Sequence, residues 1–227
     1  MARYFTPATL RFLSELAVNN ERDWFNANKS RYLADVHEPA LQFIADLAPK
    51  LSGISKHLVA DPRPQGGSLF RIYRDTRFSR DKTPYKNHLG MRFGHDGGLG
   101  VHAPGLYLHI EPGASYAGAG LWRPETAVAR TIREAIVDDP EGWKKAAHSK
   151  SFLNHFTPDG DSLTRPPKDF DPEHPLIEDL KRKDFVAGTR LTDKTVTSDR
   201  FLNDYLAMNK AAVPFLRFLT RAVGLPF

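Results

Sequence analysis

The hydrophobic period of the chain changes between Ser68 and Trp122, and this change constrains the fold most. On both sides of this region apolar residues recur at helical spacing, whereas within it apolar and polar residues alternate. Alternation of this kind is typical of strands in an antiparallel sheet with one buried face. The sequence therefore predicts an α+β fold, in which one mainly antiparallel sheet carries N-terminal and C-terminal helices packed on one face.

The N-terminal helices have recognisable ends. Thr6 is expected to cap a helix that begins at Pro7 and stops near residues 19–20, where two asparagines follow each other. A second helical stretch over residues 24–48 has apolar residues at spacing four. Pro39 should kink or split this stretch, because proline lacks the amide hydrogen that an interior helical position donates.

Helical spacing returns after the sheet region. The expected elements are a helix with Pro124 at its first position that ends near residue 138, a short helix around Trp143, an extended connection over 157–175, a short helix at 176–182, a strand at 185–191, and a C-terminal helical stretch capped by Ser198 and broken near Pro214. Within the sheet region, the glycine-rich residues 95–100 are expected to form a hairpin loop.

Composition limits the class of protein. The chain has 227 residues, of which 41% are hydrophobic, so we expect a single domain over residues 1–227 with a packed core. It contains no cysteine, and neither its N-terminal residues nor any other run has the apolar length of a signal peptide or a membrane span. The sequence therefore predicts a cytoplasmic protein without a membrane partner.

Cationic side chains are concentrated between Arg71 and Tyr85. This segment contains five cations and only two acidic residues. Because guanidinium groups bind carboxylates and phosphates through paired hydrogen bonds, the segment suggests a site for an anionic ligand. The ligand-binding residues that we predict are Arg71, Tyr73, Arg74, Arg77, Lys82 and Tyr85. The Arg-Asp neighbours within the segment fit equally well a second interpretation, in which internal ion pairs order a loop.

The polar side of the alternating segments carries further functional side chains. If the strands pair in register, this side collects Arg71, Tyr73, His88, Arg92, Tyr107, His109 and Glu111. Gly118 and Gly120, with the small Ala117 and Ala119, leave little side chain above the sheet, which is typical of a pocket floor or, alternatively, of a bulge or a tight helix contact.

His109 and Glu111 are the candidate catalytic residues. They stand two positions apart on one predicted strand, so an imidazole and a carboxylate can reach the same proton or the same metal ion. A third metal ligand could come from His88 or Glu125, but the chain has no established metal-ligand motif, and we predict no metal and no other cofactor. The common hydrolase, metalloprotease, P-loop and Rossmann motifs are also absent, so the sequence leaves open whether the protein is an enzyme.

The pattern Arg-x-x-Arg-Asp-x-Arg-Phe-x-x-x-Lys-x-Pro-Tyr at residues 71–85 resembles the signature of the domain of unknown function 2461 family, a group of uncharacterised bacterial and fungal proteins. The resemblance extends to Asn19-Asn20 with Trp24-Phe25, to Leu-His-Ile-Glu-Pro at 108–112 and to Gly-Leu-Trp-Arg-Pro-Glu at 120–125. It covers nearly the whole chain. It implies no particular activity, ligand or catalytic residue.

The function that the sequence favours is the binding of a small anionic ligand on the polar sheet face, beside the cationic loop. A structural or protein-interaction domain, with the arginines in internal ion pairs, is the alternative. Weak binding of nucleic acid is a second alternative and is disfavoured, because the net charge is only +5 and no basic stripe with exposed aromatic residues occurs outside residues 71–86.

Overall fold

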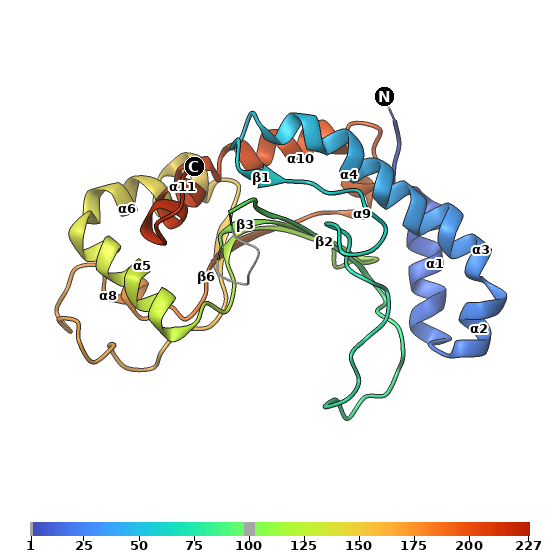
Figure 1. The fold of residues 1–227 in the computed structure, drawn as a ribbon, viewed down its shortest axis with the longest axis horizontal. Coiled ribbons are helices and arrows are strands. Elements are labelled where there is room, and N and C mark those ends of the chain that lie inside the picture. The colour runs from blue at the N-terminus through green and yellow to red at the C-terminus, as the bar shows by residue number, and fades with distance from the viewer. Residues whose placement is uncertain (1, 98–102) are drawn as a thin grey trace.

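A six-stranded antiparallel sheet forms the centre of the protein. The computed structural model describes residues 2–97 and 103–227, and Figure 1 shows the sheet between two groups of helices. The strands follow the order β1-β2-β3-β4-β6-β5, and every neighbouring pair is antiparallel. Their bounds are Leu58–Val59 for β1, Leu89–His95 for β2, Gly105–Ile110 for β3, Tyr116–Leu121 for β4, Thr157–Asp159 for β5 and Phe185–Arg190 for β6. Of the hairpin loop expected at 95–100, residues 98–100 lie outside the described ranges.

The N-terminal helices begin and break where the sequence predicts. Helix α1 spans Pro7–Val18, and the hydroxyl of Thr6 caps it by accepting a hydrogen bond from the amide of Ala8. The second stretch is divided into α2 at Arg22–Ala27, α3 at Lys29–Tyr32, a π-helical turn at Leu33–His37 and α4 at Glu38–Leu51. Pro39 lies in the first turn of α4, where its missing amide hydrogen costs no helical hydrogen bond.

The remaining helices are α5 at Thr126–Asp138, α6 at Pro140–Ala147, α7 at Lys150–Leu153, α8 at Ile177–Leu180, α9 at Asp193–Val196, α10 at Phe201–Lys210 and α11 at Val213–Ala222. Two predicted starts are wrong by a few residues. Pro124 precedes the N-cap Glu125 instead of opening α5, and Ser198 accepts from the amide of Arg200 in a turn before α10. None of the helices in the described ranges combines the length and apolar character that a bilayer crossing requires.

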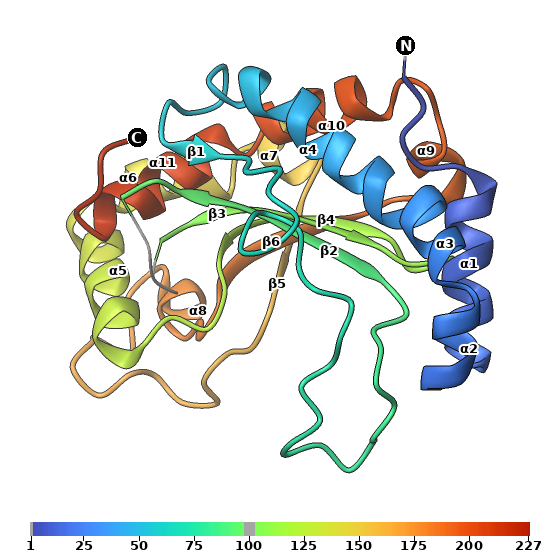
Figure 2. The same cartoon turned by 45° about the vertical axis from the view of Figure 1, so that its right-hand side comes forward.

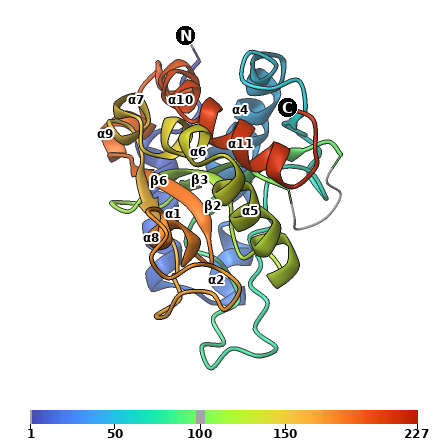
Figure 3. The ribbon, with the colours of Figure 1, turned by 90° about the vertical axis from the view of Figure 1, so that its left-hand side faces the viewer.

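The apolar face of the sheet forms the core. Leu89, Met91 and Phe93 on β2 pair with Ile110, Leu108 and Leu106 on β3, and all six side chains are buried. Helices α4, α10 and α11 cover this face, as Figures 1, 2 and 3 show. The tyrosine Tyr205 of α10, for example, packs edge-on against Phe93. The predicted packing of N-terminal and C-terminal helices on one face is therefore confirmed.

Residues 71–86, which we call the arm, form a loop, and the alternating residues 70–73 at its start do not form the strand that the alternation predicted. Around them the structure has only isolated bridges, Leu69 with Met91 and Tyr73 with Tyr85. The arm instead pairs loosely with itself, since the amide of Arg74 donates to the carbonyl of Pro84. Figure 2 shows the arm extending away from the sheet, on the side opposite the covering helices. The projecting part of the arm has no strand of the sheet beside it, so its backbone does not join the hydrogen-bond ladder.

A single asparagine fixes the base of the arm to the N-terminal helices. The side-chain amide of Asn20 donates to the carbonyl of Tyr85 at 2.9 Å, and its oxygen accepts from the amide of Tyr85 at 3.0 Å. The buried ring of Tyr85 stacks on Phe25 of α2, with the ring centroids 4.1 Å apart. These contacts join positions that are 65 residues apart in the chain.

Asn20→Ala should destabilise the protein by about 1–3 kcal/mol, because it leaves two backbone groups of Tyr85 without partners. Urea denaturation measures the free energy of unfolding. Asn19→Ala is the control, because the exposed Asn19 side chain bonds only within its own helix, and it should cost less than about 0.5 kcal/mol. Equal effects of the two substitutions would contradict the assigned role of Asn20.

Candidate functional site

The pairing of β2, β3 and β4 brings polar and aromatic side chains together on the face opposite the core. Arg92 pairs with Tyr107, and His109 pairs with Gly90 on one side and Tyr116 on the other. Side chains at paired positions point to the same face of a sheet. The register therefore places Arg92, Tyr107 and His109 on one face, as the alternation predicted, and it adds Tyr116.

A groove of about 500 Å³ lies over this face. Its floor is largely backbone, because Gly118 of β4 pairs with Gly188 of β6. A Cβ atom at Gly118 would meet only ordinary contacts, the closest at 3.7 Å from Tyr107. The groove's side chains include those of Phe70, Arg92, Tyr107, Tyr116, Trp122 and Asp159. The structure thus provides a hollow with a bare floor and aromatic walls.

The two glycines of β4 have different roles. Gly120 has φ +123°, and a Cβ atom there would lie 2.1 Å from the carbonyl oxygen of Phe185. This position requires glycine because another backbone comes close to it. Gly118 has no such restriction and leaves the floor of the groove open. The close neighbour of Gly120 is the backbone of β6, not the helix that the sequence analysis considered.

Arg92 contributes a positive charge to the groove. Its guanidinium donates one hydrogen bond to the carbonyl of Ala103 at 3.1 Å. Among the described residues no carboxylate forms an ion pair with it. Our sequence analysis placed Arg92 on the polar face but did not include it in the ligand-binding set. The position of Arg92 opposite Tyr107 marks it as a groove residue, and only the register of the two strands reveals this position.

His109 and Glu111 are in direct contact at one end of this face. The Nε2 atom of His109 lies 2.9 Å from a carboxylate oxygen of Glu111, and its Nδ1 atom lies 3.2 Å from the hydroxyl of Tyr107. The second carboxylate oxygen of Glu111 accepts a hydrogen bond from Asn87 at 2.8 Å. The buried His109 ring therefore has a partner at each nitrogen.

Two more rings enclose His109. His88 stacks on it from the β2 side with a centroid distance of 4.2 Å, and Tyr116 stacks on it from β4 at 4.6 Å. Burial, together with the charge of His109, lowers the pKa of His88 to about 4, so His88 is neutral at pH 7. Burial raises the pKa of Tyr107 and of Tyr116, and both hydroxyls stay protonated.

Glu125, the other metal ligand considered from the sequence, lies at the start of α5 and outside this group.

The cationic residues of the arm are engaged mainly with the arm itself. Arg74 pairs with Asp81 and also contacts Thr83, Arg77 pairs with Asp75 at 2.7 Å, and Lys82 donates to the carbonyl of Thr76. The hydrogen bond from Arg77 lowers the pKa of Asp75 to about 2, and the backbone amide of Thr83, followed by Arg74, does the same for Asp81.

The predicted ligand-binding set is therefore not gathered at one point. Arg71, Tyr73, Arg77 and Lys82 are exposed, whereas Tyr85 is buried against α2. Within the described ranges, no hydrogen bond or ion pair connects these residues to His109 or Glu111. The charge of Arg74 nevertheless helps to lower the pKa of His88.

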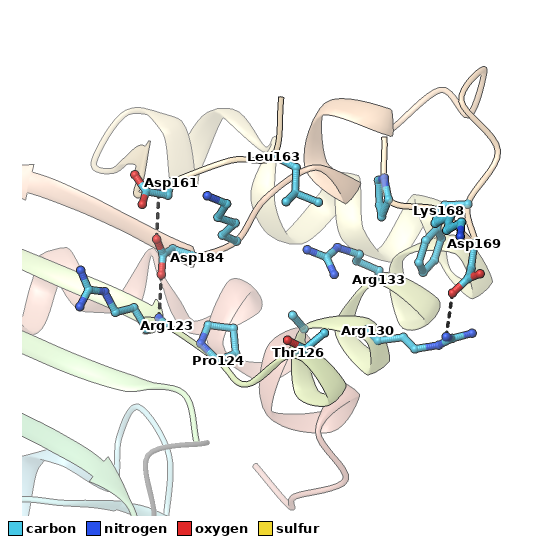
Figure 4. A pocket seen from close by; sticks show the side chains of 14 residues that line it. Arg123, Pro124, Thr126, Arg130, Arg133, Asp161, Leu163, Lys168, Asp169 and Asp184 are labelled. Atoms are coloured by element: carbon cyan, nitrogen blue, oxygen red, sulfur yellow. Dashed lines mark hydrogen bonds and ion pairs between the residues drawn. The ribbon is translucent and has the colours of Figure 1, made fainter. Parts of the chain in front are cut away.

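A second hollow, of about 620 Å³, lies between α5 and the segment before β6, and Figure 4 shows its lining. Several of its charged groups have partners within the protein. Asp184 accepts from the amides of Arg123 and Asp161, and Arg130 pairs with Asp169. The buried Arg133 donates to the carbonyls of Leu180 and Arg182. These contacts tie α5 to the connection that precedes β6, so we interpret this hollow as structural.

Comparison with known proteins identifies one similarity. The model of a family described as "Conserved hypothetical protein (DUF2461)" matches residues 8–218 of this chain. No curated protein and no solved structure matches the chain.

Replacement of the two β4 glycines tests the assignment of the groove floor. Gly120→Ala should destabilise the protein by about 1–3 kcal/mol, because it combines a strained backbone with a steric clash. Gly118→Ala should be neutral or slightly stabilising, since alanine fits there and restricts the unfolded chain. Thermal unfolding of both variants measures the difference. A large loss of stability in Gly118→Ala would show that the floor is closed by a contact.

Proposed function

The chain belongs to the DUF2461 family, and we propose that it binds a small anionic ligand in the groove on the polar face of its sheet. One observation carries the proposal: Arg92 faces a hollow with a backbone floor and has no carboxylate partner among the described residues. A guanidinium in such a position is available to a carboxylate or phosphate of a ligand.

The walls of the groove suggest the rest of the ligand. Tyr107, Tyr116 and Trp122 present aromatic surface, and the backbone at Gly118 and Gly188 allows a flat group to approach closely. The volume of about 500 Å³ falls within the range of small-molecule sites. We therefore propose a ligand with a flat apolar body and one anionic group.

Chemistry on a bound ligand would fall to His109 and Glu111, the catalytic residues that we proposed from the sequence. Tyr107 and Tyr116 line the groove and contact His109, so the pair adjoins the proposed binding site. The cytoplasmic location expected from the cysteine-free sequence stays a prediction. We do not propose the nucleic-acid function, because the arm's Arg74, Arg77 and Lys82 are engaged with its own acceptors.

Arg92→Gln should weaken ligand binding by about 10- to 100-fold, since a hydrogen bond to a charged group contributes about 1.5–3 kcal/mol. The measurement is a thermal-shift titration with phenyl phosphate and benzoate in the presence of EDTA, with benzyl alcohol as the neutral control. Gly118→Leu, which fills the floor, should also abolish the shift. The proposal is wrong if neither anion stabilises the wild type more than benzyl alcohol does.

The arm favours the alternative function, a protein-interaction domain. Its own acids and carbonyls hold Arg74, Arg77 and Lys82, while Phe78 at the projecting end is 94% exposed. A large apolar side chain that projects into solvent on an ordered loop is typical of a contact residue for a partner.

Arg77→Ala distinguishes the groove from the arm as the anion site. Because Asp75 already holds this exposed guanidinium, the substitution should leave the thermal shift with phenyl phosphate unchanged. Isothermal titration calorimetry with phenyl phosphate compares the affinities of the wild type and of Arg77→Ala. Loss of binding in Arg77→Ala would show that the anion binds at the arm, as the sequence analysis predicted.

A further inference from the structure

We propose that His88, His109 and Glu111 form a binding site for a divalent transition-metal ion, with Zn²⁺ as the best-fitting ion. The proposal goes beyond ligand binding in the groove, because it gives His109 and Glu111 the role of metal ligands. Two imidazoles and one carboxylate make up a recurrent ligand set of catalytic zinc and non-haem iron sites. The sequence analysis predicted no metal, since the three residues follow no established spacing.

The positions of the ligand atoms support the proposal. One ligand atom from each of the three residues can be chosen so that all lie within 4.8 Å of one another. The Nε2 atom of His109 and the nearer oxygen of Glu111 are 2.9 Å apart. Two ligands bound to one Zn²⁺ ion at about 2.1 Å in tetrahedral geometry would be about 3.4 Å apart. The two ligand atoms are therefore adjacent and must move apart by about 0.5 Å to take the ion.

The hydrogen bonds around His109 leave its Nε2 atom facing negative charge. The hydroxyl oxygen of Tyr107 lies 3.2 Å from Nδ1 of His109 and can accept a hydrogen from it. In this tautomer Nε2 carries a lone pair, and it lies against a carboxylate oxygen of Glu111. Two electron-rich atoms at this distance require a shared positive centre, which is either a proton or a metal ion.

The residues around His109 and Glu111 hold these two ligands in place, whereas the ring of His88 is stacked at 28° to that of His109 and must turn to direct a nitrogen at the same ion. Asn87 donates to the second oxygen of Glu111, and the hydroxyl of the buried Ser115 accepts from the backbone amide of Glu111. His109 is fixed by Tyr107 and by stacking between His88 and Tyr116. Partners of this kind orient metal ligands and strengthen metal binding. Three protein ligands also leave a coordination position for water or substrate, as in catalytic zinc sites.

A second cluster with the same composition lacks these properties. In the group His57, His95 and Asp96, both nitrogens of His95 are already used. Its Nδ1 atom accepts from the amide of Gly97 at 3.0 Å, and its Nε2 atom donates to the carbonyl of Pro226 at 2.7 Å. No lone pair of His95 remains for a metal ion. This cluster therefore serves as an internal control.

The test is titration of the EDTA-treated, dialysed protein with Zn²⁺ by calorimetry and with Co²⁺ by visible absorption. Wild type should bind one ion per chain, and Co²⁺ should produce absorption bands of a site with nitrogen and oxygen ligands. Asn87→Ala should weaken binding by about 10- to 100-fold, which is usual for loss of an outer partner. His88→Ala and Glu111→Gln should weaken it more, and His57→Ala should not change it. Circular dichroism checks that each variant is folded.

The proposal is overturned if wild type binds neither ion, or if His57→Ala abolishes binding while His88→Ala does not. Gly118→Leu and His88→Ala separate this result from the proposed function. Gly118→Leu should retain Zn²⁺ and lose the response to phenyl phosphate, whereas His88→Ala should lose Zn²⁺ and retain that response in EDTA. Binding of Zn²⁺ without any response to the anions would support the metal site and contradict the ligand-binding proposal.

Discussion

The two-residue period of strand β3 determines both the core and the candidate site. Leu106, Leu108 and Ile110 must be buried beneath the helices, and the pleat then sends the intervening side chains to the other face. A shift of one residue in the pairing would exchange the two sets and place His109 in the core. The hydrophobic effect on one face therefore fixes the positions of the functional groups on the other.

The polar face differs from an ordinary solvated sheet because part of it has no side chains. Gly118 and Gly188 lie side by side on β4 and β6, so the backbone itself forms the floor between larger groups. The surrounding rings of Tyr107 and Tyr116 then stand above this floor and connect the groove to His109. The groove and the His109–Glu111 pair therefore lie on neighbouring parts of one sheet.

Local sequence signals predicted the fold well. The cap at Thr6, the break near Pro39 and the alternation along β2 and β3 act over a few residues, and the structure contains all three. The arrangement of the site was harder to foresee, because it depends on contacts between distant positions. The Arg-Asp neighbours suggested ion pairs within a loop, but nothing near Arg74 reveals that its partner is Asp81, and nothing near Asn20 reveals that it holds the base of the arm.

The arm has a mechanical consequence for the rest of the molecule. Between Arg74 and Pro84 its backbone makes almost no hydrogen bonds to other elements, and its anchorage is concentrated at Asn20 and the buried ring of Tyr85. We expect the outer part of the loop to exchange its amide hydrogens faster than the strands do, because few hydrogen bonds hold it. The arm contacts the rest of the protein mainly at its base, and the charge of Arg74 also acts on His88.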